Sequence, residues 1–307
     1  MNDVLKSIVI HEVGLRDGLQ VEPVIVPAKK KIEWLQKLID AGIRHIQVGS
    51  FVHPKLVPQM ADVDDLFQII RKTIQLPNNV VLSGLVLNER GLERAFEAKA
   101  DKILMGVSAS ETHSMKNTKM TVKESTNRIT AMAKSCIKNN IPVQVSVQSS
   151  FGCGYEGKVP QENVMSIIEK YFESGINNIS LADTAGHAIP CDVESLFGKI
   201  LDLNPNVELS CHFHNTFGFG MLNIVAAAKM GVKYIETSFG GLGGCPFTKI
   251  PAGNVATEDL VHYLQRMGFM NQINLQKLIA LVKDLSSFLG KELTGYVYKI
   301  GQINWNY

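Results

Sequence analysis

The feature that most constrains the fold of this chain is a regular alternation of two kinds of segment. Short runs rich in β-branched residues are each followed by a longer stretch in which apolar residues repeat with helical spacing. Successive runs begin mostly about 25–40 residues apart, the length of one strand, one helix and their loops. The runs predicted as strands are Ser7–Val13, His45–Val48, Val80–Val86, Lys102–Val107, Val143–Val147, Asn178–Leu181, Glu208–His212 and Tyr234–Thr237.

Helix-like segments follow these runs. They are Lys29–Ala41, Asp62–Ile74, Glu89–Ala98, Val122–Asn139, Gln161–Ser174, Asp192–Leu203, Gly218–Met230 and Thr257–Arg266. The alternation predicts an α/β fold, a closed (β/α)8 TIM barrel that forms a single domain over residues 1–307. A doubly wound open sheet is the main alternative, but the turn after the first strand lacks the G-x-G-x-x-G pattern frequent in such sheets.

The C-terminal part of the chain extends beyond the eight predicted pairs. A further helical pattern over Leu275–Leu289 predicts a C-terminal helical extension, and we place this helix and its tail at about residues 268–307. We expect the extension to pack on the barrel. The last residues, 304–307, would pack there or against a second subunit.

Composition argues against several classes of protein. The chain is 45% hydrophobic and 20% charged, and 31 Lys and Arg residues against 29 Asp and Glu residues give a formal net charge of +2. This balance disfavours a dedicated nucleic-acid or polybasic membrane surface, and no apolar run reaches the ~18–20 residues that span a bilayer. The five cysteines are an odd number, and the N-terminal segment leaves no room for a secretory leader before the first strand. We therefore expect a cytoplasmic globular protein.

In a barrel of this class the reactive groups lie on the loops that follow the strands, at the C-terminal face. Unusual polar residues of the sequence gather at these positions. They are Arg16, Asp17, Gln47, Ser50, Ser110, Glu111, Gln148, Asp183, His212, His214, Cys245 and Asn254. The sequence therefore predicts a polar site at one end of the barrel.

His212 and His214 have the most specific spacing among these residues. Residues two apart on a strand point to the same side, so the two imidazoles can supply adjacent ligands to a divalent metal. Asp17 and a neutral oxygen donor such as Asn254 would complete the protein ligands. Mixed nitrogen and oxygen ligation with open positions suits Mg, Mn, Zn or Fe rather than a closed structural zinc site. The alternative is a pair of hydrogen-bonded histidines at a strand end.

A glycine-rich segment, Phe239–Pro246, holds four glycines within five residues, followed by Cys245. Such a segment predicts a mobile loop, and a lone thiol at its end predicts a reactive group that reaches the site when the loop closes. A phosphate-binding cradle or a plain flexible turn is the alternative. Cys153 lies on another predicted rim loop without comparable support, and we expect Cys136 and Cys191 to be packing residues.

Seven stretches of the chain form a longer pattern. They are GLRDGLQ (14–20), SFVHPKLVPQMAD (50–62), SASETHSMKN (108–117), FGCGYEGKV (151–159), HFHNT (212–216), GLGGCP (241–246) and AGNVATEDLV (252–261). In this order, from about residue 8 to about residue 290, the chain resembles 3-hydroxy-3-methylglutaryl-CoA (HMG-CoA) lyases. The resemblance implies a metal-dependent barrel, most often loaded with Mg or Mn, that cleaves this CoA thioester to acetyl-CoA and acetoacetate. It also implies a homodimer.

The resemblance implies roles for the residues at matching positions. The metal ligands would be Asp17, His212, His214 and Asn254. The catalytic residues would be Cys245, Arg16, Asp17 and His212, and the substrate-binding residues Arg16, Gln20, Gln47 and Asp183. In the implied retro-Claisen cleavage, the metal lowers the pKa of the substrate hydroxyl, Arg16 stabilises negative charge on the thioester oxygen, and Cys245 protonates the acetyl carbanion. Asp17 or His212 would take the hydroxyl proton, and the sequence leaves that choice open.

The chain also departs from these lyases. Gln47 stands where they usually carry a glutamate, and an amide cannot act as a general base at neutral pH. Leu15, Gly154, Ala182 and Asn215 replace the usual proline, proline, glycine and aspartate. These departures leave three alternatives open: a lyase for a different 3-hydroxy-3-alkylglutaryl-CoA, a Claisen-condensing synthase of the isopropylmalate or homocitrate type, and a catalytically silent homologue.

Overall fold

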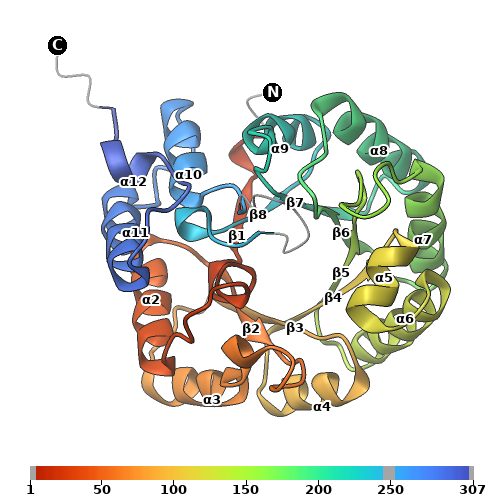
Figure 1. The fold of residues 1–307 in the computed structure, drawn as a ribbon, viewed down its shortest axis with the longest axis horizontal. Coiled ribbons are helices and arrows are strands. Elements are labelled where there is room, and N and C mark those ends of the chain that lie inside the picture. The colour runs from red at the N-terminus through yellow and green to blue at the C-terminus, as the bar shows by residue number, and fades with distance from the viewer. Residues whose placement is uncertain (1–4, 245–252, 304–307) are drawn as a thin grey trace.

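The structure is a computed structural model that describes residues 5–244 and 253–303. Among these residues, eight parallel strands close into a barrel in chain order, each paired with the next and the last with the first (Figure 1). The strands are β1 (Val9–Glu12), β2 (His45–Ser50), β3 (Val81–Leu85), β4 (Lys102–Ser108), β5 (Val143–Gln148), β6 (Asn178–Asp183), β7 (Glu208–Phe213) and β8 (Tyr234–Thr237). The predicted TIM barrel is confirmed.

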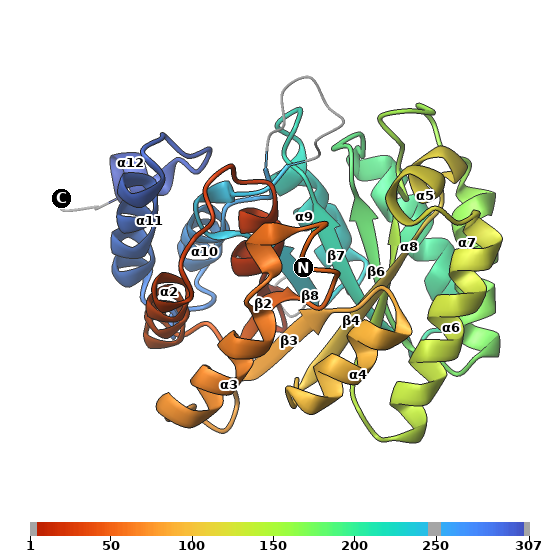
Figure 2. The same ribbon diagram turned by 60° about the horizontal axis from the view of Figure 1, so that its bottom comes forward.

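Helices form a ring outside the strands (Figure 1), and the tilted view in Figure 2 shows them flanking the barrel. They are α2 (Ala28–Ala41), α3 (Val63–Thr73), α4 (Glu89–Glu97), α5 (Glu111–Thr118), α6 (Val122–Lys138), α7 (Gln161–Glu173), α8 (Pro190–Leu203), α9 (Gly220–Lys229), α10 (Thr257–Arg266), α11 (Leu275–Leu289) and α12 (Val297–Ile300). Short helical turns are η1 (Gly14–Gly18), η2 (Pro58–Met60) and η3 (Phe239–Gly241). In the described part of the chain, no helix is long and apolar enough to cross a membrane.

Two short helices near the C-terminal rim were not predicted from the sequence. The turn η1 directly follows β1, and α5 directly follows β4. Apolar residues do not repeat with helical spacing in either segment, so their helical form depends on local hydrogen bonds. In α5, the hydroxyl of Ser110 caps the helix by accepting a hydrogen bond from the backbone N–H of His113 at 3.1 Å.

The interior of the barrel is polar, whereas the layer between strands and helices is apolar. Gln144 on β5 donates from Nε2 to Glu236 Oε1 on β8 at 2.7 Å. These strands are not neighbours in the sheet, so this bond crosses the inside of the barrel. Both residues are buried. Since buried polar groups need hydrogen-bond partners, the interior side chains bond to one another across the strands.

The long helix of the C-terminal extension, α11, packs beside α2 (Figure 1). The carboxylate of Asp284 on α11 accepts hydrogen bonds from Lys30 Nζ and Trp34 Nε1 on α2, each at 2.8 Å. The rings of Trp34 and Phe288 pack edge to face, with centroids 5.4 Å apart. The predicted C-terminal helical extension is present, and these contacts fix α11 to the helix that precedes β2. Residues 304–307 lie outside the described residues.

Candidate metal centre

The turn η1 carries Arg16 and Asp17 from the end of β1. A buried carboxylate, Glu12, supports this turn: its Oε1 accepts from the backbone N–H of Gly14 at 2.7 Å and of Phe239 at 3.1 Å. A Cβ on Gly14 would lie 2.4 Å from the Phe239 ring, so only glycine fits there. Burial raises the pKa of Glu12 to about 7. The turn that bears Arg16 and Asp17 is thus tied to the loop that follows β8.

His212 and His214 come from the end of β7 and face Asp17. Their Nε2 atoms lie 3.1 Å apart, and each is 3.8 Å from Asp17 Oδ2. One potential ligand atom from each of the three residues lies within 4.8 Å of the others. Both histidines are buried. The structure therefore brings together the acid and the two imidazoles that the sequence predicted.

Asn254 joins this cluster from the segment that precedes α10. It forms a β-bridge with His214, and its Nδ2 donates to Asp17 Oδ2 at 2.8 Å and to the Leu242 carbonyl at 2.9 Å. Its Oδ1 is buried without a hydrogen-bond partner among the described residues. A buried acceptor without a partner costs about 1–3 kcal/mol unless something fills it, and a cation would do so. One carboxylate, two imidazoles and one carboxamide oxygen form a donor set that suits Mg²⁺ or Mn²⁺.

Charge in the cluster is balanced by Arg16. Its guanidinium donates to Asp17 Oδ1 at 2.5 Å. Burial alone would raise the pKa of Asp17, but Arg16 and the two imidazoles outweigh burial and hold that pKa well below its ordinary value. Asp17 is therefore a carboxylate at neutral pH, the form that binds metal.

Gln47, on β2, holds the Arg16 guanidinium through a different nitrogen from the one that contacts Asp17. Its Oε1 accepts from Arg16 Nε at 2.6 Å. The Nε2 of Gln47 is buried and has no hydrogen-bond partner among the described residues. The departure noted in the sequence thus leaves a neutral amide, with a free donor, beside the guanidinium.

The remaining predicted residues lie less close to this cluster. Asp183 at the end of β6 is fully buried, and its two oxygens accept from the backbone N–H groups of His187 and Ala188 at 2.8 and 3.0 Å. Those bonds hold the loop after β6, and a substrate contact for Asp183 stays a prediction. Gln20 is half-buried beyond η1, and its contact with the substrate stays a prediction. Cys245 lies outside the described residues.

The glycine-rich segment passes close to the cluster at Gly243. Gly243 has φ +104°, and a Cβ built there would lie 2.6 Å from Asn254 Nδ2 and 3.1 Å from Asp17 Oδ2. Only a glycine allows this backbone to pass so close to two predicted ligands. Cys245 follows two residues later in the chain.

Sequence reasoning missed Glu236 on β8. Its Oε2 lies 3.0 Å from His212 Nδ1, on the opposite side of the ring from the cluster. Burial would raise the pKa of Glu236, but the His212 hydrogen bond and nearby positive charges lower it to about 2. A charged residue inside the short apolar strand β8 was the available signal, since an interior charge needs a partner.

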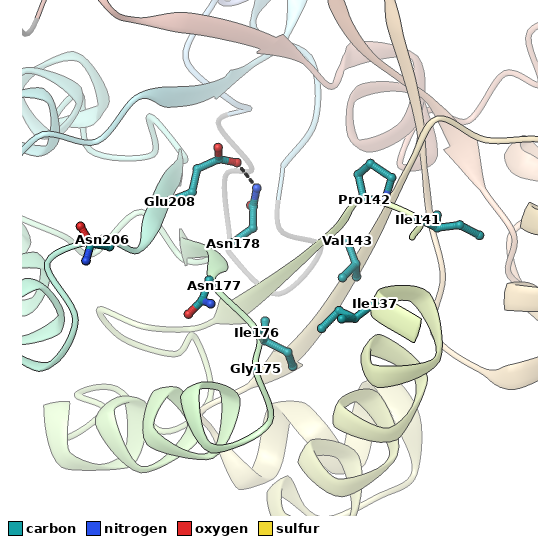
Figure 3. A pocket seen from close by; sticks show the side chains of 10 residues that line it. All are labelled: Ile137, Ile141, Pro142, Val143, Gly175, Ile176, Asn177, Asn178, Asn206 and Glu208. Atoms are coloured by element: carbon teal, nitrogen blue, oxygen red, sulfur yellow. Dashed lines mark hydrogen bonds between the residues drawn. The ribbon is translucent and has the colours of Figure 1, made fainter. Parts of the chain in front are cut away.

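A pocket of about 360 Å³ opens elsewhere on the molecule (Figure 3). Its lining includes Val143, Asn178 and Glu208, the first residues of β5, β6 and β7. It therefore lies at the N-terminal ends of the strands, the end that serves stability in barrels of this kind. None of the predicted site residues lines it.

The fold and the rim cluster together define the class of protein. It is a TIM-barrel protein with a candidate divalent-metal centre at the C-terminal ends of β1 and β7, next to a partly buried arginine.

Comparison with known proteins identifies the family within that class. The HMGL-like family model matches residues 7–285, so the chain belongs to the HMGL-like family. It is 38% identical over 288 residues to hydroxymethylglutaryl-CoA lyase YngG of Bacillus subtilis, covering 94% of this chain and 95% of that protein. It is 36% identical to the (R)-citramalyl-CoA lyase of Chloroflexus aurantiacus, covering 97% and 96%. An HMG-CoA lyase from Acinetobacter baumannii, solved with coenzyme A and 3-methylmalate, superposes with a TM-score of 0.90 at 37% identity, covering 98% and 97%.

Proposed function

We propose that this protein cleaves 3-hydroxy-3-methylglutaryl-CoA into acetyl-CoA and acetoacetate, with a divalent metal held by Asp17, His212, His214 and Asn254. The observation that carries the proposal is the convergence of these four side chains beside Arg16, in a chain of the HMGL-like family. The relatives named as HMG-CoA lyases align over nearly the whole chain.

The metal, when bound, would polarise the substrate hydroxyl and lower its pKa. Asp17 or His212 would accept the hydroxyl proton. The bond between C2 and C3 of the acyl chain then breaks, the hydroxyl carbon becomes the ketone of acetoacetate, and the electron pair passes to the thioester as an enolate. Arg16, held by Gln47 and Asp17 at 2.6 and 2.5 Å, would donate hydrogen bonds to the enolate oxygen.

Cys245 would complete the reaction by protonating the enolate carbon to give acetyl-CoA. The thiol stands two residues after Gly243, whose backbone passes against Asn254 and Asp17. This position supports the role, because the segment that precedes the thiol already borders the cluster. Gln20, Gln47 and Asp183 would contact the acyl chain or its carboxylate.

The acyl chain of the substrate is the main alternative. A relative of equal coverage is named for (R)-citramalyl-CoA, whose acid arm is one methylene shorter than that of HMG-CoA. Other 3-hydroxy-3-alkylglutaryl-CoA thioesters carry an alkyl group longer than methyl on the hydroxyl carbon. Gln47, neutral and beside Arg16, is the residue that motivates a test of these substrates.

The experiment is a substrate panel on the purified protein with added Mg²⁺ or Mn²⁺. The panel contains HMG-CoA, a longer 3-hydroxy-3-alkylglutaryl-CoA and (R)-citramalyl-CoA, and acetyl-CoA is measured by mass spectrometry. We expect the highest kcat/KM with HMG-CoA. Higher kcat/KM with another thioester would move the assignment to that substrate, and no acetyl-CoA from any of them would overturn it.

Two further arms separate the remaining alternatives. A synthase would instead release free CoA from acetyl-CoA plus a 2-oxo acid. A catalytically silent homologue would show no turnover in the wild-type protein and would gain activity in Gln47→Glu. Turnover of tens per second by the wild-type protein would exclude the silent homologue.

The same proposal extends to the metal cofactor, the cellular compartment and the oligomeric state. Mg²⁺ or Mn²⁺ is the cofactor we assign, because oxygen ligands are part of the donor set. We place the protein in the cytoplasm as a homodimer, and its products fit leucine degradation and ketone body metabolism. Size-exclusion chromatography with light scattering measures the oligomeric state directly.

A further inference from the structure

A chain of hydrogen bonds crosses the barrel interior and ends on one of the predicted metal ligands. Lys102 Nζ on β4 donates to Gln144 Oε1 on β5 at 2.9 Å, and Gln144 Nε2 donates to Glu236 Oε1 on β8 at 2.7 Å. Glu236 Oε2 then meets His212 Nδ1 on β7 at 3.0 Å. All four residues are buried, so water does not replace these partners.

In this series of hydrogen bonds, the donor and acceptor of each bond are fixed by the bond before it. Lys102 Nζ and Ser210 Oγ both donate to the same atom of Gln144, its Oε1, at 2.9 and 3.3 Å. The amide of Gln144 therefore presents its Nε2 donor, and not its oxygen, to Glu236. An amide turned the other way would place oxygen against a carboxylate.

The hydrogen bonds of the two Glu236 oxygens can be assigned in the same way. Its Oε1 accepts from Gln144 Nε2 and also from Ser180 Oγ at 3.2 Å. Its Oε2 is left for His212 alone among the described residues. A carboxylate only accepts hydrogen bonds, so the ring proton of His212 must sit on Nδ1. The lone pair of Nε2 then faces His214 and Asp17.

We propose that Glu236 is a positioning residue that fixes the tautomer and the ring orientation of His212, and that Gln144 and Lys102 hold Glu236 in the orientation it needs. The inference rests on the proposed function, because it takes His212 as a ligand of the divalent metal. Carboxylate partners of ligating histidines hold the ring and increase the basicity of the ligand nitrogen, and their loss weakens metal binding by about 10–100-fold.

The two histidines are held differently, which makes the inference specific to one of them. His214 Nδ1 is buried with no hydrogen-bond partner among the described residues. The backbone bridge from His214 to Asn254 positions that residue instead. Substitutions in the interior hydrogen-bond network should therefore alter the tautomer and ring orientation of His212 and leave the position of His214 unchanged.

The test measures Mn²⁺ affinity of the full-length protein without substrate, by electron paramagnetic resonance of free Mn²⁺. Glu236→Gln keeps the shape of the side chain but supplies an amide that can donate to Nδ1, which permits the other tautomer. We expect Glu236→Gln to bind Mn²⁺ about 10–100-fold more weakly. Gln144→Met leaves Glu236 in place without its anchor, and we expect a smaller loss, about tenfold, at the lower end of the range known for such outer partners.

Ser83→Ala is the matched control. It removes another buried hydrogen bond of the barrel interior, between Ser83 Oγ and His11 Nε2 at 2.9 Å, while every hydrogen bond of the chain from Lys102 to His212 stays in place. We expect its Mn²⁺ affinity to equal that of the wild type. Equal affinity in a folded Glu236→Gln protein would overturn the inference. Weakening by Ser83→Ala as large as that by Glu236→Gln would overturn it as well, because a general loss of packing would then explain both.

A second readout does not depend on metal. Nitrogen-15 NMR of the metal-free protein distinguishes the two histidine tautomers, and His212 is assigned by comparison with a His212→Gln sample. We expect the Nδ1–H form at His212 in the wild type and a mixture in Glu236→Gln. An Nε2–H form in the wild type would overturn the inference while leaving the proposed function intact. A wild-type protein that binds no Mn²⁺ would overturn both.

Discussion

The Nε2 atoms of His212 and His214 lie 3.1 Å apart, and Asp17 Oδ2 is 3.8 Å from each of them. Two imidazole nitrogens at this distance repel each other if both present lone pairs, unless a proton or a cation lies between them. The nearby carboxylate adds negative charge at the same point. A proton on one of the two nitrogens removes this repulsion in the metal-free protein. A divalent cation would remove it as well and would also pair with the carboxylate, which gives the cluster a physical reason to bind metal.

Removing one imidazole should weaken metal binding before it weakens the fold. We expect His214→Ala to reduce the bound metal of the purified protein at least tenfold, measured by inductively coupled plasma mass spectrometry, with little change in thermal unfolding of the metal-free protein. His45→Ala is the control, because His45 begins β2 at the opposite end of the barrel. Full metal content in His214→Ala would argue against the ligand set.

The thiol of Cys245 should be needed for chemistry but not for metal binding. We expect Cys245→Ala to lower kcat by about 10²–10⁴-fold, the usual contribution of a general acid, while metal content stays near that of the wild type. Cys153→Ala provides a matched substitution, since Cys153 is buried against Ser110 Oγ at 3.1 Å and has no role in the proposal. Loss of metal from Cys245→Ala would instead make the thiol a ligand.

The barrel could be predicted from a repeated local pattern, and much of the candidate cluster from that barrel together with the spacing of two histidines. Strand and helix alternation sets the fold, and a two-residue spacing places His212 and His214 on one side of β7. Asn254 and Asp17 are 237 positions apart, and only the closure of the sheet brings them within 2.8 Å. The position of Asp17 was predicted from that closure.

The interior network was beyond the reach of these patterns. Gln144 and Glu236 are 92 positions apart on strands that are not neighbours, and their contact depends on the direction of each side chain into the barrel. The alternation of valine with polar residues in β5 places Gln144 on the face opposite to the valines, but it does not show which side chain of a distant strand Gln144 meets across the barrel. The sequence likewise could not show that both oxygens of Asp183 accept hydrogen bonds from backbone N–H groups of the loop after β6.

The close approach of Gly243 to the cluster should make that position sensitive to a single methyl group. Gly243 has φ +104°, and its added Cβ would lie 2.6 Å from Asn254 Nδ2. We expect Gly243→Ala to lower Mn²⁺ affinity by on the order of tenfold, the size of effect known for disturbed ligand partners. Isothermal titration calorimetry measures this change.

The control for that substitution separates backbone strain from crowding. Gly157 also has a positive φ, +76°, but a Cβ there meets nothing within 4 Å. Gly157→Ala should destabilise the fold by about 1–2 kcal/mol through strain alone and leave Mn²⁺ affinity unchanged. If both variants lost affinity equally, proximity to Asn254 would not be the cause.

The buried carboxyl of Glu258 should make stability depend on pH. Glu258 lies in the first turn of α10. Its Oε2 accepts a hydrogen bond at 3.0 Å from the backbone N–H of Gly240, in the loop after β8. Burial, with the nearby carboxylates of Asp259 and Glu12, raises its pKa from 4.5 to about 8. The folded protein therefore binds more protons than the unfolded chain between these pH values, so its free energy of unfolding falls as pH rises, by up to about 1.4 kcal/mol per pH unit.

Glu258→Gln should remove this contribution, because a glutamine mimics the protonated acid at every pH. We expect the variant to lose less stability than the wild type between pH 5 and about pH 8, measured by urea unfolding at one-unit steps. Glu169→Gln, at an exposed position on α7, is the control and should keep the wild-type slope. Parallel slopes for wild type and Glu258→Gln would mean that Glu258 titrates in the folded protein as it does in the unfolded chain, and that its burial has no energetic consequence for the loop it supports.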